Sequence, residues 1–188
     1  MSTATYNETR WIIETRQCTG TLNLDTTISG AAVVDNGNGT VTLETNDAHG
    51  FLAGSQLYIE GLTNYNGTCE VTEVTTSGIT IKKNYIAETP DGTETIGFVV
   101  DPGCDFRLLE ASLHLSAAAA TEEEFVCTLD AHAGSAYDEV VFSEDVNGHA
   151  NIVWSGERLF VNGDKLRFTL PNTDGRTYGL MIKYLRIR

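Results

Sequence analysis

Apolar and polar residues alternate in short runs along the chain, and the clearest of these runs lie between residues 48 and 81. Residues 56–59 and 68–74 alternate, a turn-rich stretch over 61–67 separates them, and a third run covers 79–81. Successive side chains of a strand point to opposite faces of its sheet. Alternation broken by Gly and Asn therefore indicates half-buried antiparallel strands, and this stretch predicts a small barrel or meander.

Similar runs predict strands on both sides of this stretch. Before residue 104 they cover 10–14, 18–24, 31–35, 40–44 and 96–100. Between two of these runs lies Asn36-Gly37-Asn38-Gly39, which predicts a hairpin because Asn-Gly tolerates the positive φ of tight turns. This turn does not have the spacing of a calcium-binding loop. Asp101-Pro102-Gly103 then marks a change in composition and a domain boundary.

The last part of the chain predicts an amphipathic strand over 106–115, with Leu109, Ala111, Leu113 and Leu115 on one face. Residues 117–124 are expected to form a connection, since so short a run of helix formers is marginal as a helix. Six further strands are predicted over 124–129, 139–143, 150–154, 158–160, 165–170 and 179–186. Short strands at this spacing are typical of a sandwich.

The predicted fold is therefore all-β: a β-sandwich or jelly roll with an inserted small β-barrel. Residues 1–27 and 100–188 would form the sandwich, with the N-terminal strands completing its sheet, and residues 28–99 would be the inserted module. Insertion at a loop tip is tolerated because it disturbs little packing. A tandem arrangement of two domains is the alternative.

The formal charge of −14, from 12 basic and 26 acidic residues, disfavours a nucleic-acid partner. Residues 158–188 nevertheless carry +5, which leaves −19 on residues 1–157. Basic strands beside acidic ones would explain this split. A basic face that docks on an acidic partner would explain it too, and its interface candidates are Arg167, Arg176, Lys183, Arg186 and Arg188.

Motifs for catalysis or metal binding are missing from the sequence. Cys18, Cys69, Cys104 and Cys127 lack the spacing of a zinc site, and none of the four histidines lies in a known catalytic motif. Cys69 is expected to be packed and His49 to make a turn hydrogen bond.

The acidic residues Asp138, Glu139, Glu144 and Asp145 could supply a glycosidase-like pair, as any acidic β protein could. The run Glu122-Glu123-Glu124 is expected to be a solvated loop. We expect no enzyme activity and no cofactor. No apolar stretch is long enough for a membrane span, so no membrane partner is expected.

Aromatic residues near predicted loops could stack on sugars. Tyr58, Tyr65, Tyr85 and Tyr137 have such positions, and the candidates for a ligand loop are Asn64, Tyr65 and Tyr85. Packing inside a hairpin or barrel is the alternative role for each tyrosine.

Two segments resemble known families. His49-Gly50-Phe51, Gly54, Asn64-Tyr65-Asn66-Gly67-Thr68 and Val71-Thr72 resemble a small β-barrel module of tailed-phage virion proteins, which is similar to a half-domain of ubiquitin-activating enzymes. In those enzymes the catalytic cysteine lies outside the related module, so Cys69 inherits no role. The phrases FRLLEASLHLS, LDAHAGSAYDEVVFSED and GDKLRFTLPNTDGRTYGLMIKY resemble β-rich structural proteins of tailed phages.

These resemblances imply a structural protein of a bacteriophage virion, assembled in the host cytoplasm. Capsid decoration and a place in the neck or tail are both compatible with them. The implied partners are copies of the chain itself, in a homo-oligomer, and other virion proteins of the capsid, neck or tail. A carbohydrate-binding module that recognises a host surface glycan is the alternative function.

Overall fold

The computed structural model describes residues 12–20, 25–46 and 49–187. In these ranges the regular structure is β, apart from the single 3-10 turn η1 (Ser135–Tyr137). A four-stranded antiparallel sheet has the order β1 (Ile12–Gly20), β14 (Tyr178–Arg186), β9 (Phe106–Leu115) and β12 (Asn151–Phe160). β1 completes this sheet by pairing with β14, as the sequence predicts.

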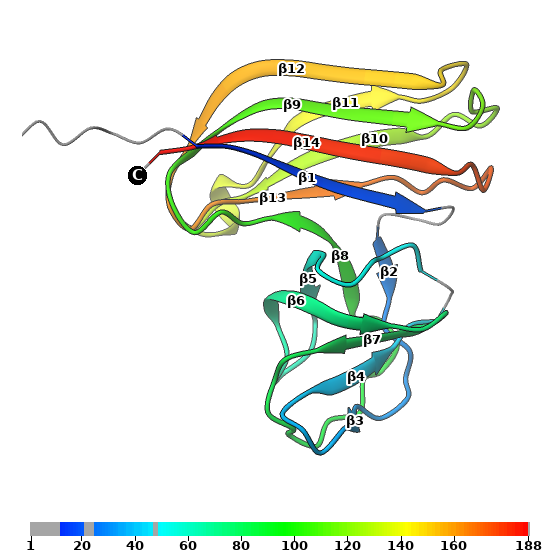
Figure 1. Cartoon of the computed structure of the whole chain (residues 1–188), viewed down its shortest axis with the longest axis vertical. Coiled ribbons are helices and arrows are strands. Elements are labelled where there is room, and N and C mark those ends of the chain that lie inside the picture. The colour runs from blue at the N-terminus through cyan, green and yellow to red at the C-terminus, as the bar shows by residue number, and fades with distance from the viewer. Residues whose placement is uncertain (1–11, 21–24, 47–48, 188) are drawn as a thin grey trace, which may run out of the picture.

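The second sheet has ten strands. It runs through β11 (Glu139–Asp145), β10 (Glu124–Asp130), β13 (Lys165–Thr169), β8 (Thr95–Val100), β5 (Gln56–Glu60), β6 (Gly67–Val74), β7 (Gly78–Ile81), β4 (Val41–Glu44) and β3 (Val34–Asp35), while β2 (Asp25–Thr27) pairs with β8. In Figure 1 the four-stranded sheet and β10, β11 and β13 form two layers, and β3 to β7 lie below them.

A first hydrophobic cluster fills the space between the two layers. It includes alternate residues of β9, β10, β13 and β14, and we call it the sandwich core. Aromatic rings form much of it: Phe106 stacks on Phe160 with centroids 5.1 Å apart, and Phe125 lies 5.4 Å from Phe142. The predicted all-β sandwich is confirmed.

A second hydrophobic cluster, which we call the small core, lies among β3 to β8. Alternation along β5 and β4 buries Leu57, Ile59, Val41 and Leu43 here. β3 and β4 form the predicted hairpin. Gly37 and Gly39 in its turn have φ of 72° and 80°, which L side chains rarely adopt.

β8 belongs to both parts of the fold. Residues 95–98 pair with β5 and residues 98–100 pair with β13. Its residue Ile96 lies in the small core, whereas Phe98 and Val100 lie in the sandwich core. The division at residues 99 and 100 thus falls inside a strand, and the domain arrangement remains a prediction.

The strand predictions need three corrections. The runs 10–14 and 18–24 correspond, within the described residues, to one strand, β1. The runs 150–154 and 158–160 are likewise the single strand β12. Leu109 is a bulge residue without a register partner in either neighbouring strand, so Phe106 and Leu108 join Ala111 in the sandwich core and Leu109 does not.

Candidate interaction surfaces

The described basic residues of the C-terminal stretch are spread along the chain and not clustered at one point. Arg176 precedes β14 and Arg186 ends it, and nine strand residues at about 3.3 Å each separate their positions by roughly 30 Å. Lys183 is half-buried within β14, in register with Glu110 of β9. Arg188 lies outside the described residues. An interface role for these residues remains a prediction.

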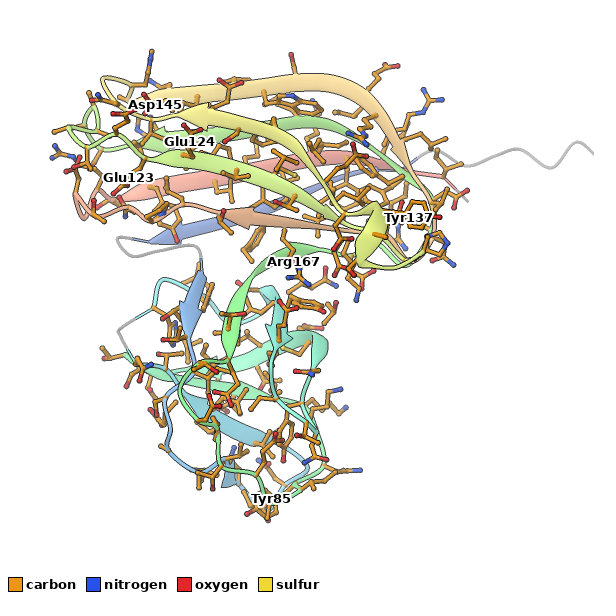
Figure 2. The ribbon with its side chains drawn as sticks, turned by 180° about the vertical axis from the view of Figure 1, so that it is seen from behind. Tyr85, Glu123, Glu124, Tyr137, Asp145 and Arg167 are labelled. Carbon is orange, nitrogen blue, oxygen red and sulfur yellow. The ribbon has the colours of Figure 1, made fainter. Side chains whose placement is uncertain are left out.

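Arg167 lies between the two parts of the fold, as Figure 2 shows. Its Nη1 donates to Glu60 Oε2 of β5 at 2.8 Å and its Nη2 donates to Asp130 Oδ2 of β10 at 3.1 Å. Its guanidinium also stacks on Tyr58, 3.8 Å from the ring centroid. Burial lowers the pKa of Arg167, but the bonds to Asp130 and Glu60 outweigh this and raise it overall. These four side chains form what we call the junction cluster.

Arg176 and Arg186 have contacts that serve local structure. Arg186 donates from Nη2 to the carbonyl oxygen of Pro102 at 2.8 Å and from Nε to Cys104 Sγ at 3.3 Å. Its side chain therefore anchors the turn before β9. The backbone N–H and carbonyl of Arg176 bond to the side chain of Asn172, whose φ is 50°.

The predicted ligand loop is only partly exposed. Tyr65 has a relative exposure of 1%, and its hydroxyl donates to the carbonyl oxygen of Ile86 and accepts from the N–H of Ile86, both at 2.8 Å. Tyr65 is thus a packed residue of the small core, as the alternative role proposes. Asn64 is exposed, with its backbone N–H bound to Glu88. Tyr85 is 44% exposed at the tip farthest from the sandwich (Figure 2).

Of the acidic residues considered for catalysis, Asp138 and Glu139 make contacts that stabilise a loop and a strand. Glu139 begins β11, directly after Asp138, whereas Glu144 and Asp145 end the strand. Asp138 accepts from the N–H of Ala131 at 2.8 Å, and Glu139 forms an ion pair with Arg158. Glu123 accepts from the N–H of Thr173 at 2.9 Å.

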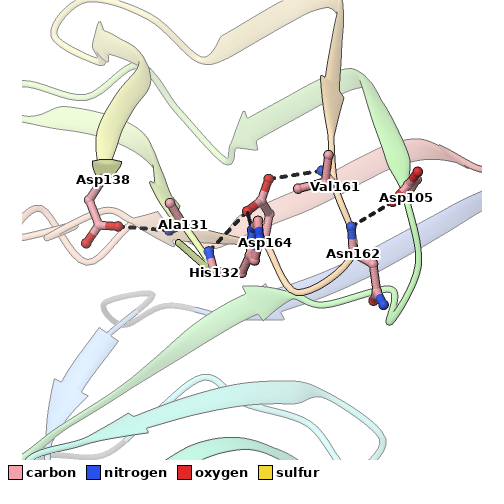
Figure 3. Close-up of polar contacts among 7 residues, drawn as sticks. All are labelled: Asp105, Ala131, His132, Asp138, Val161, Asn162 and Asp164. Atoms are coloured by element: carbon pink, nitrogen blue, oxygen red, sulfur yellow. Dashed lines mark hydrogen bonds and ion pairs between the residues drawn. The ribbon is translucent and has the colours of Figure 1, made fainter. Parts of the chain in front are cut away.

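Asp164 organises the end of the sandwich shown in Figure 3. Its carboxylate accepts from the N–H groups of His132 and Val161, at 3.1 and 3.0 Å, and contacts His132 Nδ1 at 2.9 Å. Burial raises the pKa of Asp164, but the bonds from His132 and Val161 lower it by more, so it lies below the usual value. Asp105 similarly accepts from the N–H of Asn162 at 2.8 Å. This network joins three turns of the sandwich.

Cys69 and Cys127 are packed in the interior, and His49 takes part in a turn. Burial raises the pKa of Cys69 to about 12 and also raises that of Cys127. His49 Nδ1 accepts from the N–H of Phe51 at 3.3 Å, so its Nε2 donates to the carbonyl oxygen of Gly78 at 3.2 Å. The predicted packing of Cys69 and turn hydrogen bond of His49 are confirmed.

Two small hollows occur on the surface. One of about 120 Å³ lies beside the junction cluster and is lined by Gly97 and Thr169 as well as Tyr58 and Arg167. The other, of about 220 Å³, lies near His149 at the end of β11. Among the residues described, no three His, Cys, Asp or Glu side chains are grouped to hold a metal ion. The described part of the chain contains no helix of the length and apolarity needed to cross a membrane.

One surface of the sandwich was not identified from the sequence. β11 and β12 end their sheets on the same side, joined by the ion pair of Glu139 with Arg158 and by the stacking of Phe142 on Trp154 at 5.3 Å. Exposed apolar side chains gather along these strands and the segments beside them: Tyr137, Val140, Val153, Leu159 and Val161. We call this surface the open edge. Its sequence signal is β12 itself, in which both alternating sets contain large apolar residues.

Comparisons with known proteins leave the family open. No protein-family model matches the chain, and neither does any curated protein. The half-domain of ubiquitin-activating enzymes therefore gains no support. A complex of the major capsid proteins VP16 and VP17 of bacteriophage P23-77 is 12% identical, with 97% of this chain and 91% of that chain covered and a TM-score of 0.22. VP17 alone is 12% identical, with 95% and 98% covered and the same TM-score. A TM-score of 0.22 is too low for either likeness to support a fold or a function.

Proposed function

We propose that the chain is a non-enzymatic structural component of a tailed-phage virion that acts through contacts between subunits. Capsid decoration, the neck and the tail are the places in the particle that suit it. The proposal draws on the two sequence resemblances and on the all-β sandwich. The contacts of Asp138 with Ala131 and of Glu139 with Arg158 support it as well, because they hold parts of the fold together.

The observation that carries the proposal is the open edge. Val153 and Leu159 are 61% and 54% exposed, and both lie on β12, which ends its sheet. An exposed strand edge with apolar side chains is a site for pairing or aggregation unless another surface covers it. A protein that assembles has such a surface covered by a neighbouring subunit.

Mass spectrometry of purified particles of the phage that encodes the chain tests the proposal. We expect the chain to be present at a fixed ratio to the major capsid protein and to stay bound through washes at high salt, since apolar contacts are not screened. A nonstructural protein from the same infected cells serves as the control for carry-over. Absence of the chain from washed particles would refute the virion role.

A further inference from the structure

β12 is a long free edge. It pairs with β9 along one side, and no strand of the described chain pairs with its other side. It has ten residues, and its exposure alternates without interruption from Asn151 to Phe160. The register with β9 shifts between Ser155 and Arg158, yet the exposure of β12 keeps alternating across Gly156 and Glu157.

The other edges offer less to a partner strand. β3 has only two residues. β11 carries Glu139, Glu144 and Asp145 among its seven residues, and charges protect an edge from pairing. β1 lies on the side of the sandwich nearest β2, whereas β12 lies on the far side from the small core (Figure 1). A second molecule can therefore approach β12 without meeting the small core.

We propose that β12 pairs in antiparallel fashion with β12 of a second copy of this chain, about a two-fold axis at Gly156. In this register Val153 faces Leu159 of the second copy, so the two most exposed apolar residues of the strand cover each other. Ser155 faces Glu157, to which a hydroxyl can donate, and Trp154 faces Arg158. The two four-stranded sheets become one continuous sheet.

Charge selects this register over its neighbours. An axis at Glu157 or at Arg158 sets that residue opposite its own copy, and directly opposed like charges destabilise a strand pair. An axis at Ser155 brings Val153 opposite Glu157, which leaves the apolar side chain without an apolar partner. Among the axes at Ser155, Gly156, Glu157 and Arg158, the axis at Gly156 alone sets Val153 opposite Leu159 and opposes no like charges.

The acidic strand β11 makes the pairing depend on salt. β11 packs on β12 through Phe142 and Trp154, so the pairing brings the β11 strands of both copies near the axis. Glu139 is paired with Arg158 within its own copy, but Glu144 and Asp145 add negative charge on both sides. Since salt screens exposed charges, the dimer should tighten as ionic strength rises.

Sedimentation equilibrium of the full chain tests the pairing. A single strand pair is a small interface of the weak class, so the concentration series should extend to about 200 μM. We expect the wild-type mass to rise from 20.4 kDa toward twice that value. V153K/L159K should remain at 20.4 kDa. The control V34K/L52K adds the same charge at exposed apolar residues outside the sandwich, on the part of the fold that surrounds the small core, and it should dimerise like wild type.

Cysteine cross-linking tests the register. Opposite residues of a strand pair have Cβ atoms about 4.5–5.5 Å apart, close to the span of a disulfide. V153C/L159C should therefore form a cross-linked dimer on mild oxidation. Each single variant should not, because residue 153 lies about 20 Å from its own copy along the pair.

A wild-type chain that stays monomeric across the series would overturn the inference, as would single variants that cross-link as well as the double variant. The inference deepens the proposed function by naming a partner for the open edge, yet the two fail separately. A monomer in solution leaves the virion role standing, and absence from particles leaves the pairing standing.

Discussion

Replacement of Arg167 by Ala should weaken the connection between the two parts of the fold. The guanidinium holds Glu60 of β5 and Asp130 of β10 at once, and it covers the ring of Tyr58. Val99, the register partner of Arg167 in β8, is buried but belongs to neither hydrophobic core. Arg167 belongs to β13, which pairs with the shared strand β8. The variant therefore removes two ion pairs and one ring contact beside the strand that both cores share.

The expected loss follows from how exposed each contact is. The Arg167 and Asp130 side chains are 28% and 24% exposed, so this charged hydrogen bond should contribute about 1–2 kcal/mol after screening by solvent. Glu60 is 56% exposed, and a pair of this kind contributes about 0.2–1 kcal/mol. The contact with Tyr58 adds about 0.5–1 kcal/mol. Together they give a decrease in the free energy of unfolding of about 2–4 kcal/mol.

Urea unfolding of the full chain, followed by far-UV circular dichroism, measures this decrease. R167K should recover less than half of it, because an ammonium group cannot bind two carboxylates and stack on a ring as a planar guanidinium does. K82A, at an exposed residue after β7, is the control and should change stability by less than about 0.5 kcal/mol. The reasoning is wrong if R167A behaves like K82A, or if R167K is as stable as wild type.

Three further predictions concern single side chains. Y65F should lose about 0.5–1.5 kcal/mol in urea unfolding, because the N–H and the carbonyl oxygen of Ile86 lose the hydroxyl of the buried Tyr65, whereas Y85F should match wild type; equal stability of the two variants would contradict this. Because the pKa of Asp164 is lowered on folding, its carboxylate stabilises the fold above about pH 3.8, and this stabilisation is lost as the pH falls through the lower folded-state pKa. In thermal melts below pH 4 the melting temperature of D164N should therefore depend less on pH than that of wild type. Parallel dependences of the two melting temperatures on pH would refute the assignment. Cys69 and Cys127 should react with iodoacetamide only after unfolding, as peptide mass mapping can show. A thiol with a pKa of about 12, as for Cys69, is ionised in about 1 of 10,000 molecules at pH 8. Labelling of either cysteine in the native chain would contradict its burial.

The sequence predicts most strands because their alternation is local, and it misplaces side chains where a distant strand decides. Leu109 shows the difference. Its spacing from Ala111 and Leu113 matches one face of a regular strand, but a bulge opposite β12 and β14 reverses the faces at this residue. Phe106 and Leu108 also have the spacing of one strand face, the face opposite to that of Leu109. Only the pairing with β12 and β14 determines that Phe106 and Leu108, and not Leu109, enter the sandwich core.

The positions of the candidate site residues likewise depend on parts of the chain that are distant in the sequence. Basic residues that are close in the C-terminal sequence lie far apart because each strand residue advances the chain by about 3.3 Å. Tyr65 occurs in a turn-rich stretch typical of binding loops, yet the backbone of Ile86, 21 residues later, holds its hydroxyl inside. Neither outcome has a local signal. The open edge has one, since large apolar residues occupy both faces of β12, but its exposure follows only from the strand order.

The shared strand β8 determines what the open edge can do in an assembly. Hydrogen bonds to β5 on one side and to β13 and β2 on the other hold β8 along its whole length, so the small core is joined to the sandwich by a sheet and not by a linker. β12 lies on the side of the sandwich away from the small core, and Tyr85 lies at the opposite tip (Figure 2). Pairing through β12 would therefore set the two sandwiches at the centre of the dimer and both small cores at its outer ends, where the loops around Tyr85 stay accessible to other subunits.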